Sequence, residues 1–164
     1  MPLTERLELR PPVEGDRSRF VELFCDDEFM VFSGGTHTPE SASARFDRML
    51  ERAAEVPFAK QPVIERSSGV IVGYSGVDRY TFEGKDRLEY GCRLVPSARG
   101  RGYATEAGLA LLEVAEAAWT GELIAMIDPR NTPSANVIIK LGFSWWKRAE
   151  VEGFVDDLYR RTIG

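Results

Sequence analysis

The sequence has 164 residues and a formal net charge of -5 at pH 7, which suits one domain with a single hydrophobic core, and we expect residues 1–164 to form that domain. The acidic balance argues against a nucleic acid as the main partner, and no apolar run approaches the roughly 20 residues that cross a membrane. The two cysteines make no disulfide framework and the charged N-terminus is unlike a signal peptide, so we expect a cytoplasmic protein.

The sequence pattern predicts a mixed α/β domain. Thr38 and Pro39 mark the start of a helix, because a threonine cap followed by proline is typical of a helix N-terminus, and Gly142 is predicted to end the last helix. In chain order, we predict a strand at 6–10 and then helical segments between 15 and 56, with a break at 33–40 and a second helix at about 40–54. Strands are predicted at 58–66, 70–80 and 88–95, with turns at 67–69 and 82–86. The last elements are a helix at 104–119, a strand at 123–127, a helix opening at 132–133, and strands at 143–151 and 154–163.

The stretch Arg99–Ala104 (RGRGYA) connects the last strand of the predicted meander to the long helix. The first turn of a helix has backbone N–H groups without intrahelical partners, and the helix dipole adds partial positive charge there, so an anion is its natural ligand. Gly100 and Gly102 let the backbone approach a bulky phosphate, while Arg99 and Arg101 supply charge. We therefore predict a phosphate cradle in this loop.

A tight, solvated connection between a strand and a helix is the alternative for this loop, because such a connection would also use two glycines. The dinucleotide-binding pattern G-x-G-x-x-G fails because Thr105 stands at the third glycine position, and the pattern G-x-x-x-x-G-K-[ST] occurs nowhere in the chain. These two failures disfavour a nucleotide-phosphate binder.

Several stretches resemble the GNAT acetyltransferase superfamily. Arg99–Ala104 matches the signature [QR]-x-x-G-x-[GA]. Leu88–Ala107 resembles the central strand, loop and helix of the Rim-type branch, which includes acetyltransferases of ribosomal-protein N-termini, and the opening ERLELRPP is similar to the first strand of that branch. Asn131–Phe143 (NTPSANVIIKLGF) is similar to the motif N-x-x-[SA]-x-x-x-x-x-K-L-G-F. The resemblance covers nearly the whole chain.

The resemblance implies the GNAT fold, an α/β (α+β) domain with a mixed, mostly antiparallel sheet of about seven strands, helices on both faces and a splayed central strand pair. Pro96 agrees with the splay, because a proline has no N–H for a strand ladder. The resemblance also implies acetyl-coenzyme A as co-substrate, with its pyrophosphate on the cradle and its pantetheine arm along the strand end. The implied binding residues are Leu94, Val95, Arg99, Gly100, Arg101, Gly102, Tyr103, Ala104, Thr105 and Asn131.

Glu89 is the candidate general base for acetyl transfer. It alternates with Gly91 and Arg93 along one face of the predicted strand, and the resemblance places a glutamate near this position in many Rim-type sequences. A cross-strand or surface carboxylate is the alternative, and a water-relayed base is compatible with either role.

Ser134 is the second candidate catalytic residue. With Thr132 as the cap and Pro133 as the first helical residue, its hydroxyl lies in the first turn, where the helix dipole could steady a leaving thiolate. Simple helix capping is the alternative for Ser134 and for Asn131. Ile138 stands where many GNAT enzymes carry a tyrosine acid, which either shifts that role to Ser134 or leaves the thiolate to solvent.

No protein nucleophile is evident, so we predict direct attack on the thioester by a primary amine, either a peptide N-terminus or a small amine, in a ternary complex. A thiolate pair of Cys92 with His37 is the alternative, and a single histidine does not suggest a metal site. A catalytically silent acyl-coenzyme A sensor is the rival function.

The acceptor pocket is predicted from Phe32–Thr38, Tyr74–Tyr80 and either Trp145 or Trp146, whose aromatic and polar groups suit an amine on a partly apolar body. Neither a nucleic acid nor a membrane is expected as a partner, and a homodimer is compatible with the sequence.

Overall fold

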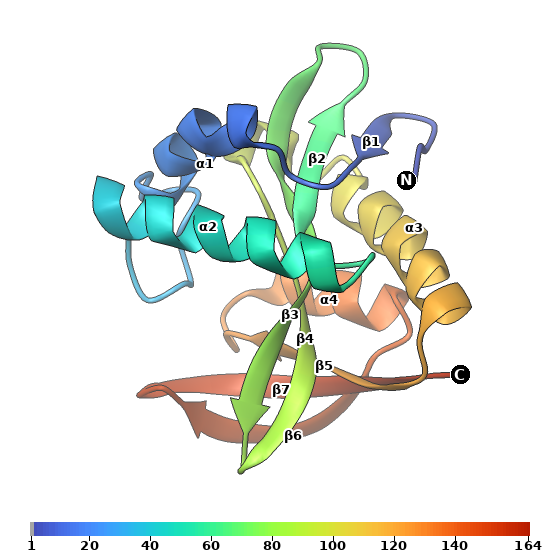
Figure 1. Ribbon diagram of the computed structural model, residues 1–164. Helices are drawn as coiled ribbons and strands as arrows, with labels where there is room; N and C mark the ends of the chain where they lie inside the picture. The colour runs from blue at the N-terminus through green and yellow to red at the C-terminus, as the bar shows by residue number, and fades with distance from the viewer. Residues whose placement is uncertain (1) are drawn as a thin grey trace.

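A seven-stranded sheet with helices on both faces dominates the computed structural model, which describes residues 2–164 (Figure 1). The helices are α1 (Arg17–Phe24), α2 (Pro39–Glu55), α3 (Tyr103–Ala118) and α4 (Thr132–Lys140), with short 3-10 helices at Glu14–Asp16 and Pro96–Ala98. The strands are β1 (Leu7–Leu9), β2 (Gln61–Glu65), β3 (Val70–Phe82), β4 (Lys85–Leu94), β5 (Gly121–Ile127), β6 (Ser144–Val151) and β7 (Phe154–Ile163).

The sheet has the strand order β1-β2-β3-β4-β5-β7-β6, and every neighbouring pair is antiparallel except β4 and β5. The parallel pair makes only two rungs, Leu88 with Leu123 and Glu89 with Ile124. Beyond these rungs β4 is paired with β3 alone and β5 with β7 alone. The predicted mostly antiparallel sheet with a splayed central pair is therefore confirmed.

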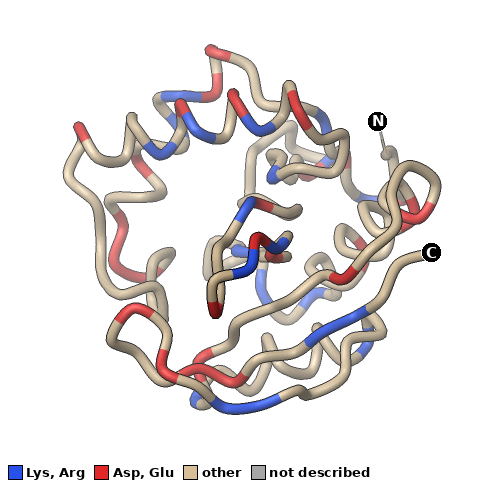
Figure 2. The backbone as a smooth tube through the Cα atoms, turned by 60° about the horizontal axis from the view of Figure 1, so that its bottom comes forward, with Lys and Arg blue, Asp and Glu red and all other residues tan. Residues whose placement is uncertain are grey.

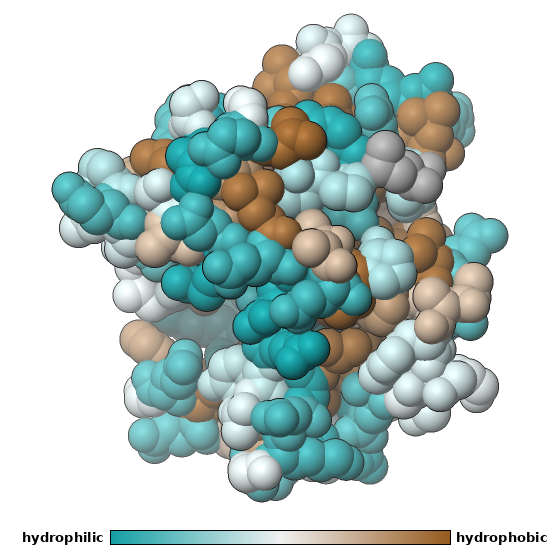
Figure 3. All heavy atoms as spheres, in the orientation of Figure 1, coloured by the Kyte–Doolittle hydropathy of each residue, from teal (hydrophilic) through white to brown (hydrophobic). Residues whose placement is uncertain are grey.

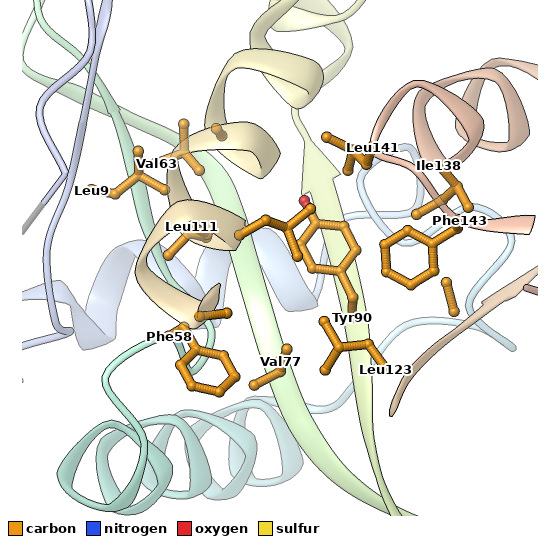
Figure 4. Packing of buried hydrophobic residues seen from close by; sticks show 14 of the residues in the cluster. Leu9, Phe58, Val63, Val77, Tyr90, Leu111, Leu123, Ile138, Leu141 and Phe143 are labelled. Carbon is orange, nitrogen blue, oxygen red and sulfur yellow. The ribbon is translucent and has the colours of Figure 1, made fainter. Parts of the chain in front are cut away.

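Each face of the sheet has its own hydrophobic cluster. α3 and α4 cover one face, where Tyr90 of β4 packs beside Leu141 and Phe143 (Figure 4). α1 and α2 cover the other face, where Phe20 stacks on Phe46 with ring centroids 5.6 Å apart. Because strand side chains alternate between faces, β4 directs its odd-numbered residues toward the side of α1 and α2.

The hairpin between β3 and β4 is tighter than predicted. The expected turn at 82–86 is a two-residue turn, in which Glu83 and Gly84 have φ of +52° and +70°. Two consecutive positive φ angles match the right-handed twist of the flanking strands, so both strands continue to the turn. The sequence pattern overestimates the turn because Lys85 and Asp86 are polar although they lie on a strand.

β2 begins at Gln61 rather than at residue 58. The residues before Gln61 form one isolated parallel bridge with β3, between Ala59 and Val77. Gly76 permits this close approach of the two backbones, because a Cβ at that position would lie 2.4 Å from the Ala59 carbonyl oxygen. The apolar run from Phe58 therefore contains this bridge as well as a strand.

Acidic and basic residues are interspersed along the whole backbone (Figure 2). Of the helices in residues 2–164, none combines the length and the apolar character that a membrane crossing needs.

Candidate active site

The loop between β4 and α3 presents a row of backbone N–H groups. Gly100 and Gly102 have φ of +71° and +81°, a region that glycine adopts without strain. Tyr103–Thr105 form the first turn of α3, and the first backbone bond runs from Glu106 N to Gly102 O at 3.0 Å. Within the described chain, the N–H groups of residues 100–105 donate to no protein acceptor. Six such donors at the positive end of a helix form an anion site.

The two arginines of this loop have different partners. Arg101 forms an ion pair with Glu65 at 3.0 Å and lies over the ring of Tyr103, whose hydroxyl donates to the same carboxylate at 2.8 Å. Arg99 donates to the carbonyl oxygen of Leu94 at 3.0 Å and forms no ion pair with any residue from 2 to 164. The free positive charge at the loop therefore comes from Arg99, whereas the charge of Arg101 is balanced.

Backbone groups of β4 face the gap between β4 and β5. In an antiparallel pair, residues alternate between those that bond to the partner strand and those that turn their N–H and C=O groups away. Val95 N donates to Val72 O at 2.8 Å, so Leu94 and Cys92 turn their backbone groups toward β5. Because β5 makes no rung with β4 beyond Ile124, a chain with amide groups fits along this edge.

The predicted role of the Val95 backbone needs correction. Its N–H bonds to Val72 and is not open to a ligand, and its carbonyl oxygen already accepts from Ala98 N at 3.0 Å. The Leu94 N–H faces the gap, although the Leu94 carbonyl already accepts from Arg99. The sequence motif does not specify which of two neighbouring residues faces the gap, because that depends on the register with β3.

Glu89 lies where β4 and β5 part, on the face that α2 covers. Its Oε2 is 3.4 Å from Lys60 Nζ, and the two side chains are 15% and 17% exposed. Burial, the largest effect, opposes the charge of Lys60, but the charges of Glu89, Tyr74 and Asp78 together raise the pKa of Lys60. Gly91 and Arg93 share this face, as predicted, and Arg93 donates to the hydroxyl of Tyr74 at 3.3 Å. Glu89 is thus a carboxylate beside the gap, held by a charged lysine.

A second carboxylate, Asp156 of β7, lies on the same face and carries no sequence motif. Burial, with the nearby charges of Asp128, Asp157 and Glu89, raises the pKa of Asp156. A carboxyl group with a raised pKa beside a candidate base is typical of acid–base sites. Sequence reasoning missed it because two adjacent aspartates on an alternating strand look like solvent-exposed residues.

Asn131, rather than Thr132, caps α4. Its side-chain oxygen accepts from Ser134 N at 3.3 Å, with Thr132 as the first helical residue and Pro133 as the second. The capping alternative therefore holds for the oxygen of Asn131. The hydroxyl of the half-buried Ser134 makes no hydrogen bond to any described residue. Ile138, which replaces the usual tyrosine, is 3% exposed in the core.

Cys92 and His37 do not form a pair. Burial raises the pKa of the Cys92 thiol to about 11, so thiolate is scarce at neutral pH. His37 lies at the start of α2, with Nδ1 3.0 Å from Ser41 Oγ and Nε2 3.2 Å from an Arg45 nitrogen. Burial, together with the charge of Arg45, lowers the pKa of His37. Among residues 2–164, no three His, Cys, Asp or Glu side chains are grouped to hold a metal ion.

A cavity of about 160 Å³ opens beneath α2. Tyr74 and Asp78, from the predicted segment 74–80, line it. Lys60 lines the cavity as well and connects it to Glu89 through their ion pair. The candidate base is therefore in contact with a residue of the cavity wall.

Trp145 and Trp146 do not line this cavity. Trp145 is 59% exposed, and Trp146 lies edge-on to Phe82 with ring centroids 5.9 Å apart. A register shift between Trp145 and Lys147 interrupts the alternation of β6 at this point. The prediction that one of the two tryptophans contributes to the pocket is therefore not supported, because neither of them lines this cavity.

Residues 6–144 match the model of the acetyltransferase (GNAT) domain family. The chain is 30% identical over 141 residues to the uncharacterized N-acetyltransferase YnaD of Bacillus subtilis (strain 168), a match that covers 85% of this chain and 79% of that protein. Among solved structures, an acetyltransferase from Agrobacterium tumefaciens str. C58 has a TM-score of 0.82 at 26% identity, over 98% of this chain and 92% of that one. A putative GnaT-family acetyltransferase from Bordetella pertussis has a TM-score of 0.85 at 21% identity, over 98% of both chains.

Two further solved structures share the fold, and the name of each states a bound cofactor or an acceptor. A GNAT superfamily phosphinothricin acetyltransferase from Sinorhizobium meliloti, solved in complex with AcCoA, has a TM-score of 0.75 at 17% identity, over 97% of this chain and 89% of that one. The ribosomal-protein-S5-alanine acetyltransferase from Vibrio fischeri has a TM-score of 0.80 at 17% identity, over 98% and 94%. At this identity the likeness shows the fold alone.

Proposed function

The chain belongs to the GNAT acetyltransferase family, and from this premise we propose that it transfers an acetyl group from acetyl-coenzyme A to a primary amine. The observation that carries the proposal is the row of six free backbone N–H groups at residues 100–105, next to an open strand edge. Such a row fits a pyrophosphate, and the strand edge fits a chain with amide groups. Family membership makes the protein an acyltransferase.

Successive parts of acetyl-coenzyme A, the pyrophosphate and the pantetheine arm, each have suitable residues in this chain. The N–H groups of residues 100–105 bind the pyrophosphate, and Arg99 adds positive charge. The Leu94 N–H and the backbone groups of Cys92 bind the pantetheine arm along β4. The side-chain nitrogen of Asn131 is left for an amide or a water, because its oxygen caps α4. Acetyl-coenzyme A supplies an activated acetyl thioester at the end of this arm.

The acceptor amine takes the acetyl group directly in a ternary complex. Its nitrogen forms the new C–N bond, the C–S bond breaks, and the sulfur leaves as a thiolate. Glu89 accepts the amine proton, directly or through a water, from its position where the strands part. Ser134, in the first turn of α4, donates to the leaving sulfur with the support of the helix dipole.

We expect transfer without an acetyl-enzyme, because the buried Cys92 thiol stays protonated. Initial rates with both substrates varied should give intersecting double-reciprocal lines, and the Cys92→Ala variant should keep most of its activity. Mass spectrometry after incubation with acetyl-coenzyme A alone should find no added acetyl group. Parallel lines together with an isolable acetyl-enzyme would overturn direct attack.

The Ser134→Ala variant should lower kcat by about tenfold or more and leave the Kd of acetyl-coenzyme A unchanged. The hydroxyl contact strengthens only as the sulfur gains charge, so its loss affects the transition state rather than binding. Thr132→Ala, an exchange in the same helical turn, is the matched control and should change neither quantity. Equal losses in kcat and in affinity for Ser134→Ala would instead indicate a structural role.

A catalytically silent acyl-coenzyme A sensor is the second candidate, and Ile138 is the observation that favours it. A buried aliphatic side chain in place of the tyrosine removes the usual proton donor for the thiolate. A sensor would bind acetyl-coenzyme A tightly and release no thiol with any amine.

The acceptor is proposed as a peptide N-terminus or a small amine. The Rim-type branch is supported by the shared fold with the ribosomal-protein-S5-alanine acetyltransferase and by the stretch Leu88–Ala107. We also propose that residues 1–164 act as one catalytic domain in the cytoplasm, which the low cysteine content supports.

A further inference from the structure

The cavity beneath α2 has an excess of positive charge. Three of its lining residues, Arg45, Arg48 and Lys60, are basic, and one, Asp78, is acidic. The surface is hollowed below α2, with mostly hydrophilic residues around the hollow (Figure 3). The excess is notable in a chain whose net charge is -5.

The protein pairs Lys60 with Glu89 but does not neutralise the charge of the two arginines. Asp78 already pairs with Arg52 at 3.1 Å. Arg45 contacts the Nε2 atom of His37 at 3.2 Å and donates to the hydroxyl of Tyr74 at 3.3 Å, but forms no ion pair with any residue from 2 to 164. Arg48 is exposed and, among the same residues, has neither an ion pair nor a hydrogen bond. Two guanidinium groups are therefore available to an anion that enters the cavity.

The hydroxyl of Tyr74 lies at the centre of this positive region. Arg45 and Arg93 each donate to it at 3.3 Å, and Lys60 Nζ is 5.5 Å from the ring centroid. Burial opposes ionisation of the phenol, yet the positive charges of Arg93, Lys60 and Arg45 outweigh burial and lower the pKa of Tyr74 to about 8. The cavity thus favours negative charge at the position of its own phenol.

Lys60 connects this region to the proposed base. It lines the cavity, and its Nζ is 3.4 Å from Glu89 Oε2. The ring centroid of Tyr74 is 6.0 Å from the Arg45 guanidinium and 5.5 Å from Lys60 Nζ, so a short series of contacts leads from Arg45 through Tyr74 and Lys60 to Glu89. A cavity of about 160 Å³ beside these contacts suits a small molecule better than the N-terminus of a folded protein.

Resting on the proposed function, we propose that the acceptor is a small amine that also carries a carboxylate, the chemistry of a free amino acid. Arg45 and Arg48, three residues apart on one face of α2, bind the carboxylate with planar guanidinium forks. The amine faces Glu89. Phe24 and Met49, the apolar part of the lining, contact an apolar side chain of the acceptor.

The first test compares leucine and methionine with leucinamide and methioninamide, which keep the amine and lose the negative charge. With acetyl-coenzyme A saturating, thiol release should give a kcat/KM about tenfold or more higher for the acids. An α-amide lowers the amine pKa and leaves more neutral amine, so this comparison is biased against the expected result. Equal or better rates with the amides would overturn the proposal.

The second test uses the Arg48→Gln and Arg45→Gln variants. Each should raise KM for leucine about tenfold and leave kcat/KM for leucinamide and KM for acetyl-coenzyme A unchanged. Arg48 is exposed, so its variant should fold normally, and thermal unfolding checks the Arg45 variant. Arg148→Gln, on the exposed side of β6, is the matched control and should change nothing. Equal losses with leucine and leucinamide would contradict the carboxylate site.

A binding measurement needs no turnover and separates this proposal from the proposed function. Calorimetric titration of N-acetylleucine into the protein with coenzyme A should show binding that weakens about tenfold in Arg48→Gln, while N-acetylleucinamide binds weakly to both proteins. If this pattern appears and no amine is acetylated, the carboxylate site stands and the proposed function fails. If amines are acetylated and this pattern is absent, the carboxylate site alone fails.

Discussion

The Gly102→Val variant is expected to bind acetyl-coenzyme A about 100-fold more weakly or worse, because valine cannot hold the backbone of the cradle. Residue 102 has φ of +81°, which a β-branched residue adopts only with strain, and a Cβ there would lie 3.2 Å from a guanidinium nitrogen of Arg6. Relief of that strain turns the N–H groups of residues 103–105 away from the anion. Losing two hydrogen bonds to a charged group, at about 1.5–3 kcal/mol each, accounts for an effect of this size. Calorimetric titration measures it.

Gly69→Val is the matched control for this variant. Gly69 has φ of +70°, and nothing lies within 4 Å of a Cβ added there, in the turn between β2 and β3. Both variants should lose stability in thermal unfolding because both impose backbone strain. Only the Gly102 variant should lose affinity. Unchanged affinity in Gly102→Val would remove the anion site from this loop.

The Glu89→Gln variant is expected to lower kcat by about 100-fold to 10,000-fold, because the amide cannot accept the amine proton. Its residual rate should rise with pH, as the acceptor amine loses its proton to solvent instead. Initial rates from about pH 6 to about pH 10, compared with the wild type, give both quantities. A variant with the wild-type kcat and pH profile would leave Glu89 with only a structural role.

Two further variants separate the base from its neighbours. Asp156→Asn removes the other carboxylate on this face, and a loss larger than that of Glu89→Gln would move the proton-accepting role to Asp156. Glu89→Gln also leaves the buried Lys60 without its partner, which should lower stability. Combining it with Lys60→Met should restore stability and leave kcat low if Glu89 acts on the amine.

The cradle is predictable from the sequence because its causes are local. Gly100 and Gly102 are needed for positive φ, and the free N–H groups follow from the start of α3, so both can be anticipated from neighbouring residues. The splay of β4 from β5 can be anticipated in the same way, from Pro96 and the motif around it. Local chemistry and the order of the motifs together predict the fold class.

The remaining features depend on residues far apart in the chain. The loop sequence predicts a phosphate contact for Arg101, but Glu65 of β2 meets it at 3.0 Å, so removal of Arg101 should affect the coenzyme less than removal of Arg99. The cavity brings Arg45 of α2 to Tyr74 of β3, a contact that only the packing of α2 on the sheet creates. No sequence spacing marks such a pair, and the acceptor site is therefore predicted only in part.

Thiol release from acetyl-coenzyme A, measured with and without leucine and matched to the amount of N-acetylated amine by mass spectrometry, decides between an amine acetyltransferase and a sensor. We expect release that depends on the amine, equals the acetylated product mole for mole, and nearly disappears in Glu89→Gln. Tight binding of acetyl-coenzyme A with no amine acetylated, across acids, amides, polyamines and N-terminal peptides, would contradict acetyl transfer and identify the protein as a sensor.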